Sequence, residues 1–152
     1  WMGDDIPPCE LNRVVNAGDH FGFPFIHGKN IPDTGYEAPK DFVFSQPVWE
    51  FQAHTAPLGI KFYDGESFPE YYKNGAFVAQ HGSWNRSEKV GYRLLFMKME
   101  EGDVVSADVF IDGWMSNETS WGRPVTPLIL KDGSMLISDD QADSIIRVTY
   151  KG

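Results

Sequence analysis

The chain has 152 residues, enough for one domain with a sizeable core, and its 41% hydrophobic and 14% aromatic content argues against disorder. Its formal net charge is -9, and its lysines and arginines are scattered, which argues against a surface that tracks nucleic-acid phosphates. We therefore expect a globular protein without a nucleic-acid partner.

No apolar run approaches the roughly 20 residues that a membrane-spanning helix needs, so we expect no membrane span in this chain. Trp1 stands first, without a methionine or a leader segment, and we expect the chain to be a processed product or a fragment. Cys9 is the only cysteine, which excludes a disulfide within the chain and a cysteine-based metal site.

The first 70 residues are rich in loop-forming residues, and they contain the best helix candidate, PPCELNRVVNAG at residues 7–18. Proline at its start and glycine at its end favour a helix, although the apolar spacing covers only two turns. Residues 19–42 combine two histidines and several phenylalanines with scattered glycine and proline. Loops this long inside a compact domain are usually functional, or else their secondary structure has been assigned wrongly.

Strand patterns dominate the second half of the chain. The runs at 75–80, 92–99 and 103–111 are dense in apolar residues, and 144–150 alternates apolar with polar residues. Two apolar runs within 127–140 are joined through Asp132-Gly133, and Asp-Gly between such runs is the strongest short signal for a hairpin. The sequence therefore predicts an all-β chain of antiparallel strands.

Two stretches of this half share one layout: a Gly-led turn, an apolar strand, a polar cluster and a second strand. Their first strands begin at Phe77 and Met135, which are 58 residues apart (135 − 77). A supersecondary unit repeated at about this period predicts propeller blades or an array. In a propeller, the polar strand ends of the blades meet on a shared central face.

The densest polar cluster is HGSWNR, residues 81–86, where the predicted strand at 75–80 ends. Arg86 could pair with an anion, and His81 could donate or accept a proton. The side chains of this segment, Asn85 included, could instead satisfy the loose backbone groups of a turn. Both interpretations remain open from these residues alone.

Other candidates are weaker. Arg123 follows a glycine that allows close approach and precedes a proline, so it is a site or a surface arginine. His54 stands alone, and a lone histidine is more often packed than catalytic. Asp139 and Asp140 end a strand, where such a pair binds calcium or, as we favour, starts a turn. Four tryptophans could stack on a flat ligand but more often belong to a core: Trp49, Trp84, Trp114 and Trp121.

No GxSxG, HExxH, P-loop or GxGxxG motif is present, which argues against the common hydrolase, zinc-protease and dinucleotide-binding classes. Several phrases do occur in a recognisable order: GDDIPPCELNRV, GDHFGFPF, AHTAPLGIKFYDG, GAFVAQHGSWNR, WGRPV, DGSMLISDD and RVTY. As an ordered set they resemble the C-terminal part of the glucose/sorbosone dehydrogenase family, especially its L-sorbosone dehydrogenase-like and pyranose dehydrogenase-like members. The match runs over nearly all of the chain.

The resemblance implies a six-bladed β-propeller of four-stranded blades, with residues 1–152 as the C-terminal portion of a single propeller domain, roughly half of it. It implies pyrroloquinoline quinone as cofactor, held with calcium, and a sugar, polyol or aldehyde as substrate. The sugar is then oxidised by hydride transfer to the quinone, assisted by a histidine base. A quinone or a cytochrome would accept the electrons, and the protein would be periplasmic or extracellular.

The resemblance also assigns residues. Arg123 matches an arginine that contacts a cofactor carboxylate. Arg86 and His81 fall where the family places a basic, cofactor-contacting strand end, at which some relatives carry a lysine. His54 matches a loop that lines the same face.

For calcium, the family's main-chain oxygens match Gly3 and Asp4. The catalytic base of the family lies in blades upstream of Trp1, so we expect the isolated chain to be inactive. Two alternatives remain. A non-catalytic binding propeller of the Hedgehog-interacting-protein type should carry disulfides, and a calcium-dependent propeller lactonase should carry a carboxylate and asparagine cage.

Overall fold

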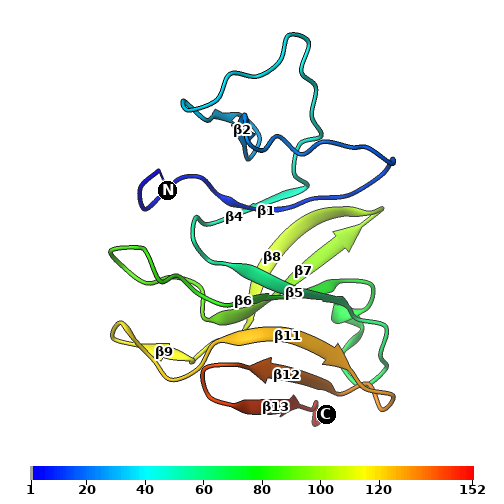
Figure 1. Cartoon of the computed structure of the whole chain (residues 1–152). Helices are drawn as coiled ribbons and strands as arrows, with labels where there is room; N and C mark the ends of the chain where they lie inside the picture. Colours follow the sequence, from blue (N-terminus) through cyan, green and yellow to red (C-terminus); the bar gives the residue numbers. More distant parts are fainter. Residues whose placement is uncertain (1) are drawn as a thin grey trace. The chain divides into compact units, whose positions relative to one another are not determined.

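The computed structural model describes residues 2–152, and these residues form an all-β structure with one short 3-10 turn (Figure 1). No α-helix occurs among them. The chain divides into two compact units, one ending at His54 and the other spanning Thr55–Gly152. The predicted all-β class and its antiparallel strands are confirmed, while the partial six-bladed propeller remains a prediction.

The first unit contains two short antiparallel pairs and otherwise irregular backbone. Strand β1 (Cys9–Leu11) pairs with β4 (Trp49–Phe51), and β2 (Ile26–His27) pairs with β3 (Ile31–Pro32). The loop-rich prediction for this half is confirmed.

The helix predicted at residues 7–18 is wrong, because Cys9–Leu11 is the extended strand β1. Val14 and Val15, which would have belonged to the apolar side of that helix, are 71% and 69% exposed. A helix of this length needs tertiary packing of an apolar face to be stable, and these valines have no such packing. Pairing with β4 satisfies the backbone of the segment instead.

The second unit is built on a four-stranded antiparallel sheet in the order β5-β6-β7-β8. Its strands are β5 (Pro57–Phe62), β6 (Ala76–Gln80), β7 (Arg93–Glu100) and β8 (Asp103–Ile111), with the 3-10 turn η1 (Glu70–Tyr72) between the first two. The strands predicted at 75–80, 92–99 and 103–111 are therefore confirmed.

A three-stranded antiparallel sheet follows in the order β11-β12-β13. It consists of β11 (Pro124–Ile129), β12 (Met135–Asp139) and β13 (Ser144–Val148). The predicted hairpin is confirmed, with Gly133 at a φ of +79° and the Asp132 carboxylate accepting the backbone N–H of Ser134 at 3.0 Å. A small hairpin of β9 (Met115–Ser116) and β10 (Thr119–Ser120) joins the two sheets.

An apolar core lies between these two sheets. It combines buried residues of both with the loops that flank them: Tyr63, Phe68, Phe77, Ala79, Tyr92, Leu94, Phe96, Trp114, Met135 and Ile137. Strand β11 contacts β5 and β6, and the Tyr63 hydroxyl donates to the Gly133 carbonyl at 3.0 Å. In Figure 1 the two sheets of this unit accordingly follow one another in colour order, green to red.

The repeated layout seen in the sequence corresponds to β6–β7 in one sheet and β12–β13 in the other. The two connections after β6 and β12 lie at the same end of the unit, since His81 and Asp140 are in hydrogen-bond contact. The polar clusters of the two stretches therefore meet, as the repeat predicts.

Candidate functional site

The segment 81–92 is a closed loop at the end of β6. Ser83 and Val90 join its two arms, because the Ser83 N–H donates to the Val90 carbonyl at 2.9 Å and the Val90 N–H donates to the Ser83 hydroxyl at 3.0 Å. Tyr92 donates its hydroxyl to the Ser83 carbonyl. The ring of Tyr92 packs on Gly82, whose φ is +100°, so a side chain at position 82 would collide with the ring.

Arg123, the residue directly before β11, reaches into this loop. Its Nε donates to the His81 carbonyl at 3.1 Å and its Nη2 donates to the Gly82 carbonyl. The guanidinium carbon lies 5.4 Å from the centre of the Tyr92 ring, a distance typical of a cation–π contact. An arginine carries five N–H donors, so three remain for a ligand.

His81 and Asp140 form an ion-pair geometry across the same end, with Nε2 at 2.8 Å from Oδ1. The His81 side chain is 16% exposed, whereas that of Asp140 is 61% exposed. The hydrogen bond from His81 lowers the pKa of Asp140, and the charges of His81 and Arg123 act in the same direction. We call His81, Arg123 and Asp140 the strand-end cluster.

Asp139 has the turn role that the sequence favoured. Its Oδ1 accepts the backbone N–H groups of Gln141 and Ala142 at 3.0 and 2.8 Å, and the residue is buried. Asp139 therefore shapes the β12–β13 turn, which presents Asp140 to His81.

The β9–β10 hairpin contacts both loops of the cluster, and no pattern in the sequence predicts this. Lys89 of the 81–92 loop donates its backbone N–H to the Glu118 carboxylate at 2.8 Å and its Nζ to the Glu118 carbonyl at 2.7 Å. On the other side, Ser120 and Gln141 exchange two hydrogen bonds. The hairpin turn is Asn117-Glu118, both with positive φ, and it lacks the glycine that would have marked it.

Arg86 lies in the same loop, beyond the Ser83–Val90 closure, and is half-buried. It shares an element with the strand-end cluster, and its contact with a cofactor remains a prediction.

The remaining predicted residues, Gly3, Asp4 and His54, belong to the first unit. His54 Nε2 lies 2.7 Å from the Gly3 carbonyl oxygen, so two of these three are brought together. Calcium takes six to eight oxygen ligands, and here the Gly3 oxygen already has a hydrogen-bond partner. Among residues 2–152 no group of three or more His, Cys, Asp or Glu side chains is placed to hold a metal ion. Two main-chain oxygens do not complete a calcium shell, and calcium binding by those of Gly3 and Asp4 stays a prediction.

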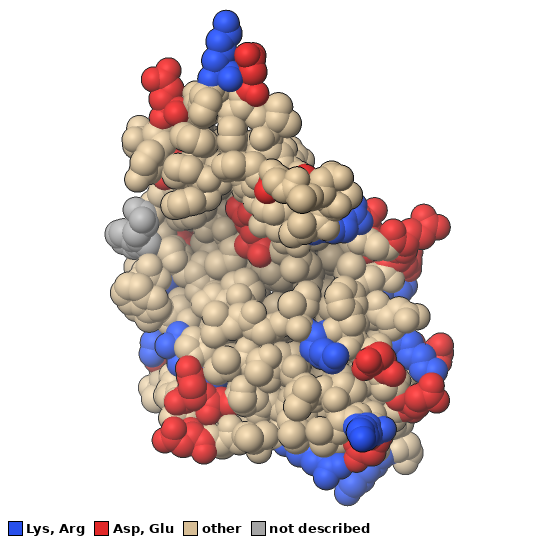
Figure 2. All heavy atoms as spheres, turned by 45° about the vertical axis from the view of Figure 1, so that its right-hand side comes forward, with Lys and Arg blue, Asp and Glu red and all other residues tan. Residues whose placement is uncertain are grey.

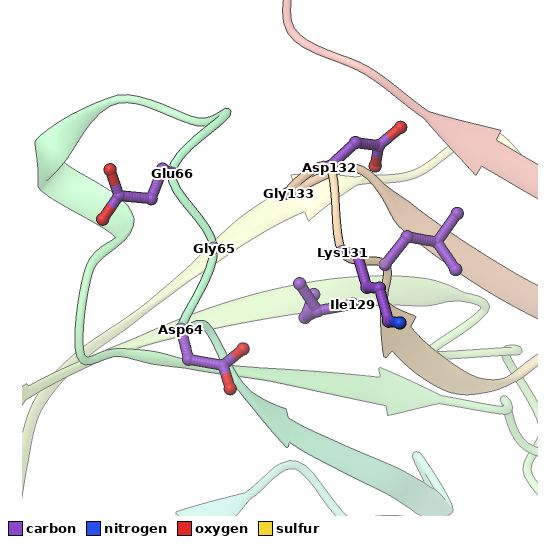
Figure 3. A pocket seen from close by; sticks show the side chains of 8 residues that line it. Asp64, Gly65, Glu66, Ile129, Lys131, Asp132 and Gly133 are labelled. Atoms are coloured by element: carbon purple, nitrogen blue, oxygen red, sulfur yellow. The ribbon is translucent and has the colours of Figure 1, made fainter.

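A hollow of about 370 Å³ lies at the end of the strands opposite the strand-end cluster, between the loop after β5 and the β11–β12 hairpin. Three carboxylates line it, and Figure 3 shows that those of Asp64, Glu66 and Asp132 do not point toward a common position. Asp132 is engaged by Ser134 and Arg147. This hollow is therefore a weaker candidate than the strand-end cluster.

The charged side chains are distributed over the surface as their scatter in the sequence predicts. On the face shown in Figure 2, positive and negative side chains are intermingled, without a continuous basic area. No helix among the described residues is both long and apolar enough to cross a bilayer.

Comparisons with known proteins identify relatives of this chain in sequence and in structure. The chain is 41% identical over 155 residues to an uncharacterized protein of Borreliella burgdorferi, covering 99% of this chain and 41% of that protein. It superposes on the calcium structure of a Trichoderma reesei carbohydrate-active enzyme of family AA12 with a TM-score of 0.78 and 21% identity, over 96% of this chain and 44% of that one.

Two further structures share the fold. A glucose dehydrogenase has a TM-score of 0.69 at 21% identity, over 98% of this chain and 38% of that one. The PQQ domain of a Coprinopsis cinerea pyranose dehydrogenase has a TM-score of 0.51 at 20% identity, over 70% of this chain and 30% of that one. The chain thus spans less than half of the length of each of these relatives.

Residues 16–151 match the family described as TrAA12-like, which covers most of the chain. The fold is that of sugar oxidoreductase domains, and the resemblance read from the sequence is confirmed. This chain belongs to the TrAA12-like family.

Proposed function

We propose that this chain is part of a sugar dehydrogenase that uses pyrroloquinoline quinone and is built on a six-bladed β-propeller. The observation that carries the proposal is the strand-end cluster, in which a half-buried arginine with spare donors stands beside a histidine held by a carboxylate. Membership of the TrAA12-like family and the shared fold with glucose and pyranose dehydrogenases support it.

The residues of the cluster fit a cofactor that carries carboxylates. Arg123 is fixed by two main-chain carbonyls and a ring, so its three free donors are presented with little loss of side-chain entropy. In a chain of net charge -9, an anionic ligand needs local positive charge of this kind. When bound, the quinone would accept a hydride from the sugar.

The other residues have supporting roles in this proposal. Asp140 orients the His81 ring through Nε2, which leaves Nδ1 for a ligand. Arg86 would add positive charge from the same loop. Among the residues assigned here none is the catalytic base, and no step is derived through calcium.

The partners follow from the same chemistry. A sugar is the substrate, and a quinone or a cytochrome takes the electrons from the reduced cofactor. A periplasmic or extracellular location belongs to the proposal as well.

The proposal is tested by measuring quinone binding and sugar-dependent dye reduction in the longest polypeptide that contains this chain. Arg123→Ala should weaken quinone binding by about ten- to a hundredfold, because a hydrogen bond to a charged group contributes roughly 1.5–3 kcal/mol. Arg123→Lys keeps the charge but loses the fork of donors, so its quinone affinity should lie between those of the unaltered protein and of Arg123→Ala.

Arg147→Ala is the matched control, since Arg147 is a half-exposed arginine that pairs with Asp132 at the opposite end of the strands. It should bind the quinone as the unaltered protein does. Failure of the unaltered protein to bind the quinone would remove the dehydrogenase proposal and favour a binding propeller. Equal losses in Arg123→Ala and Arg147→Ala would remove Arg123 from the site.

A further inference from the structure

Trp121 is an exposed tryptophan that is nevertheless fixed in place. It is 56% exposed, yet its indole Nε1 donates to the Gly113 carbonyl at 2.6 Å and its backbone N–H donates to the Trp114 carbonyl at 3.0 Å. Its ring stacks on that of buried Trp114, with the centroids 6.2 Å apart and the planes 20° apart. One side of the indole is thus supported by the core, and more than half of the residue faces solvent.

This arrangement differs from that of Trp84, another highly exposed tryptophan of the described residues. Trp84 is 82% exposed, and its indole N–H makes no hydrogen bond to any residue in the range 2–152. A large apolar ring held rigidly at the surface loses little conformational entropy when a ligand stacks on it. Trp121 therefore has the properties of a stacking platform, whereas Trp84 does not.

A hollow of about 380 Å³ adjoins this platform through Gly113, which both lines the hollow and accepts the indole hydrogen bond. Arg93 and Asp112 contribute its charged groups. Arg93 is fixed by a hydrogen bond of 2.7 Å from Nε to the amide oxygen of Gln80, which is 1% exposed. The volume falls within the roughly 300–1,000 Å³ typical of ligand pockets.

The polar groups of the hollow match hydroxyls better than an anion. Burial lowers the pKa of Arg93, and the charge of Asp112 opposes that shift. The two groups therefore interact electrostatically. A guanidinium only donates and a carboxylate only accepts hydrogen bonds, while a hydroxyl does both. Asp112 and the net charge of -9 disfavour a second anionic site here.

We propose that Trp121 and the hollow lined by Arg93 and Asp112 form a subsite for a neutral pyranose sugar. The C–H face of the pyranose ring packs on the negative face of the indole, and its hydroxyls bond to Asp112 and Arg93. Tyr92 both lines the hollow and carries the cation–π contact of Arg123, so the subsite borders the strand-end cluster. The inference deepens the proposed function and rests on it for the identity of the ligand as a sugar.

The test is fluorine NMR of the longest polypeptide that contains this chain, labelled with fluorotryptophan and titrated with glucose and cellotetraose without any quinone. Trp121→Phe identifies the Trp121 signal. That signal should shift on titration, while the signal of Trp84 should stay. Trp121→Ala should weaken the affinity by at least about fivefold, in line with the free energy of one aromatic contact.

Trp121→Phe keeps a ring but loses the bond to Gly113, so its sugar affinity should lie between those of the unaltered protein and of Trp121→Ala. Asp112→Asn should weaken the binding of both glucose and cellotetraose. Tyr150→Ala is the control and should weaken it less, since Tyr150 is an exposed aromatic residue outside the hollow. Sugar binding that leaves the Trp121 signal unmoved, or that survives Trp121→Ala, would overturn the subsite.

Dye reduction with the quinone separates this inference from the proposed function. Quinone-dependent reduction with an unchanged KM in Trp121→Ala would overturn the subsite and leave the dehydrogenase standing. A shift of the Trp121 signal without any quinone binding would remove the dehydrogenase and leave the subsite standing.

Discussion

Arg123 shows how one side chain can belong both to the fold and to a site. Two of its donors hold the carbonyls of His81 and Gly82, which fixes the loop at the end of β6. The same bonds aim the rest of the guanidinium, so the structural and ligand-facing interpretations of the HGSWNR segment are compatible. From the sequence alone, these two interpretations were alternatives.

A prediction at this scale concerns the Asp140 carboxyl. Its folded pKa lies below the usual 3.8, chiefly because of the hydrogen bond from His81. The stability that the pair contributes is therefore complete above about pH 4 and is lost as the pH falls through the lowered folded pKa. In His81→Ala the pKa of Asp140 should rise toward 3.8, as followed by NMR of the side-chain carboxyl carbons.

Asp132 is the internal reference for that titration. Its pKa is lowered by Ser134 and Arg147 at the other end of the strands, so it should not respond to His81→Ala. An unchanged Asp140 midpoint in His81→Ala would show that the pair does not form in solution.

At the scale of elements, the two sheets of the second unit approach each other closely at Gly59 of β5 and Thr126 of β11. A Cβ added to Gly59 would lie 2.5 Å from the Thr126 Cα, which is backbone and cannot swing away. The packing of the two strands therefore requires the glycine. Its backbone conformation does not, because Gly59 has no positive φ.

Gly59→Ala should accordingly destabilise the protein by about 1–3 kcal/mol, the usual cost of overpacking, as measured by denaturant unfolding. Gly152→Ala, whose added Cβ would meet nothing closer than 3.6 Å, is the control and should leave the midpoint unchanged. Equal midpoints for the two variants would show that β5 and β11 do not pack as described.

At the scale of the whole molecule, the second unit depends on one core between two sheets, and Tyr63 connects them. Its hydroxyl donates to the Gly133 carbonyl at 3.0 Å and accepts the Phe68 N–H at 2.7 Å, with 1% of the residue exposed. Tyr63→Phe leaves both backbone groups buried and unpaired.

The expected cost is about 1–3 kcal/mol for each orphaned group, although part of it is recovered if the loop relaxes. Amide hydrogen exchange should show a loss of protection in β6 and β12 together, because the sheets share the core. Tyr150→Phe removes an exposed hydroxyl and should change neither sheet. A loss confined to one sheet would contradict a shared core.

Several elements could be predicted because their causes are local. The Asp-Gly hairpin needs only a positive φ at Gly133, and the strands β6, β7 and β8 follow from dense apolar runs between turn residues. The helix at 7–18 failed because residues that favour a helix locally found no apolar surface to cover, while β4, distant in sequence, offered a pairing partner.

The sequence by itself determined the all-β class, the strand positions of the second half and the family, since these depend on local periodicity and on an ordered set of motifs. Only the tertiary structure decided which polar residues meet. His81 and Asp140 are 59 residues apart, and Arg123 reaches the carbonyls of His81 and Gly82 from 42 and 41 residues away. Such long-range contacts form when strands from separate parts of the chain are packed against a common core.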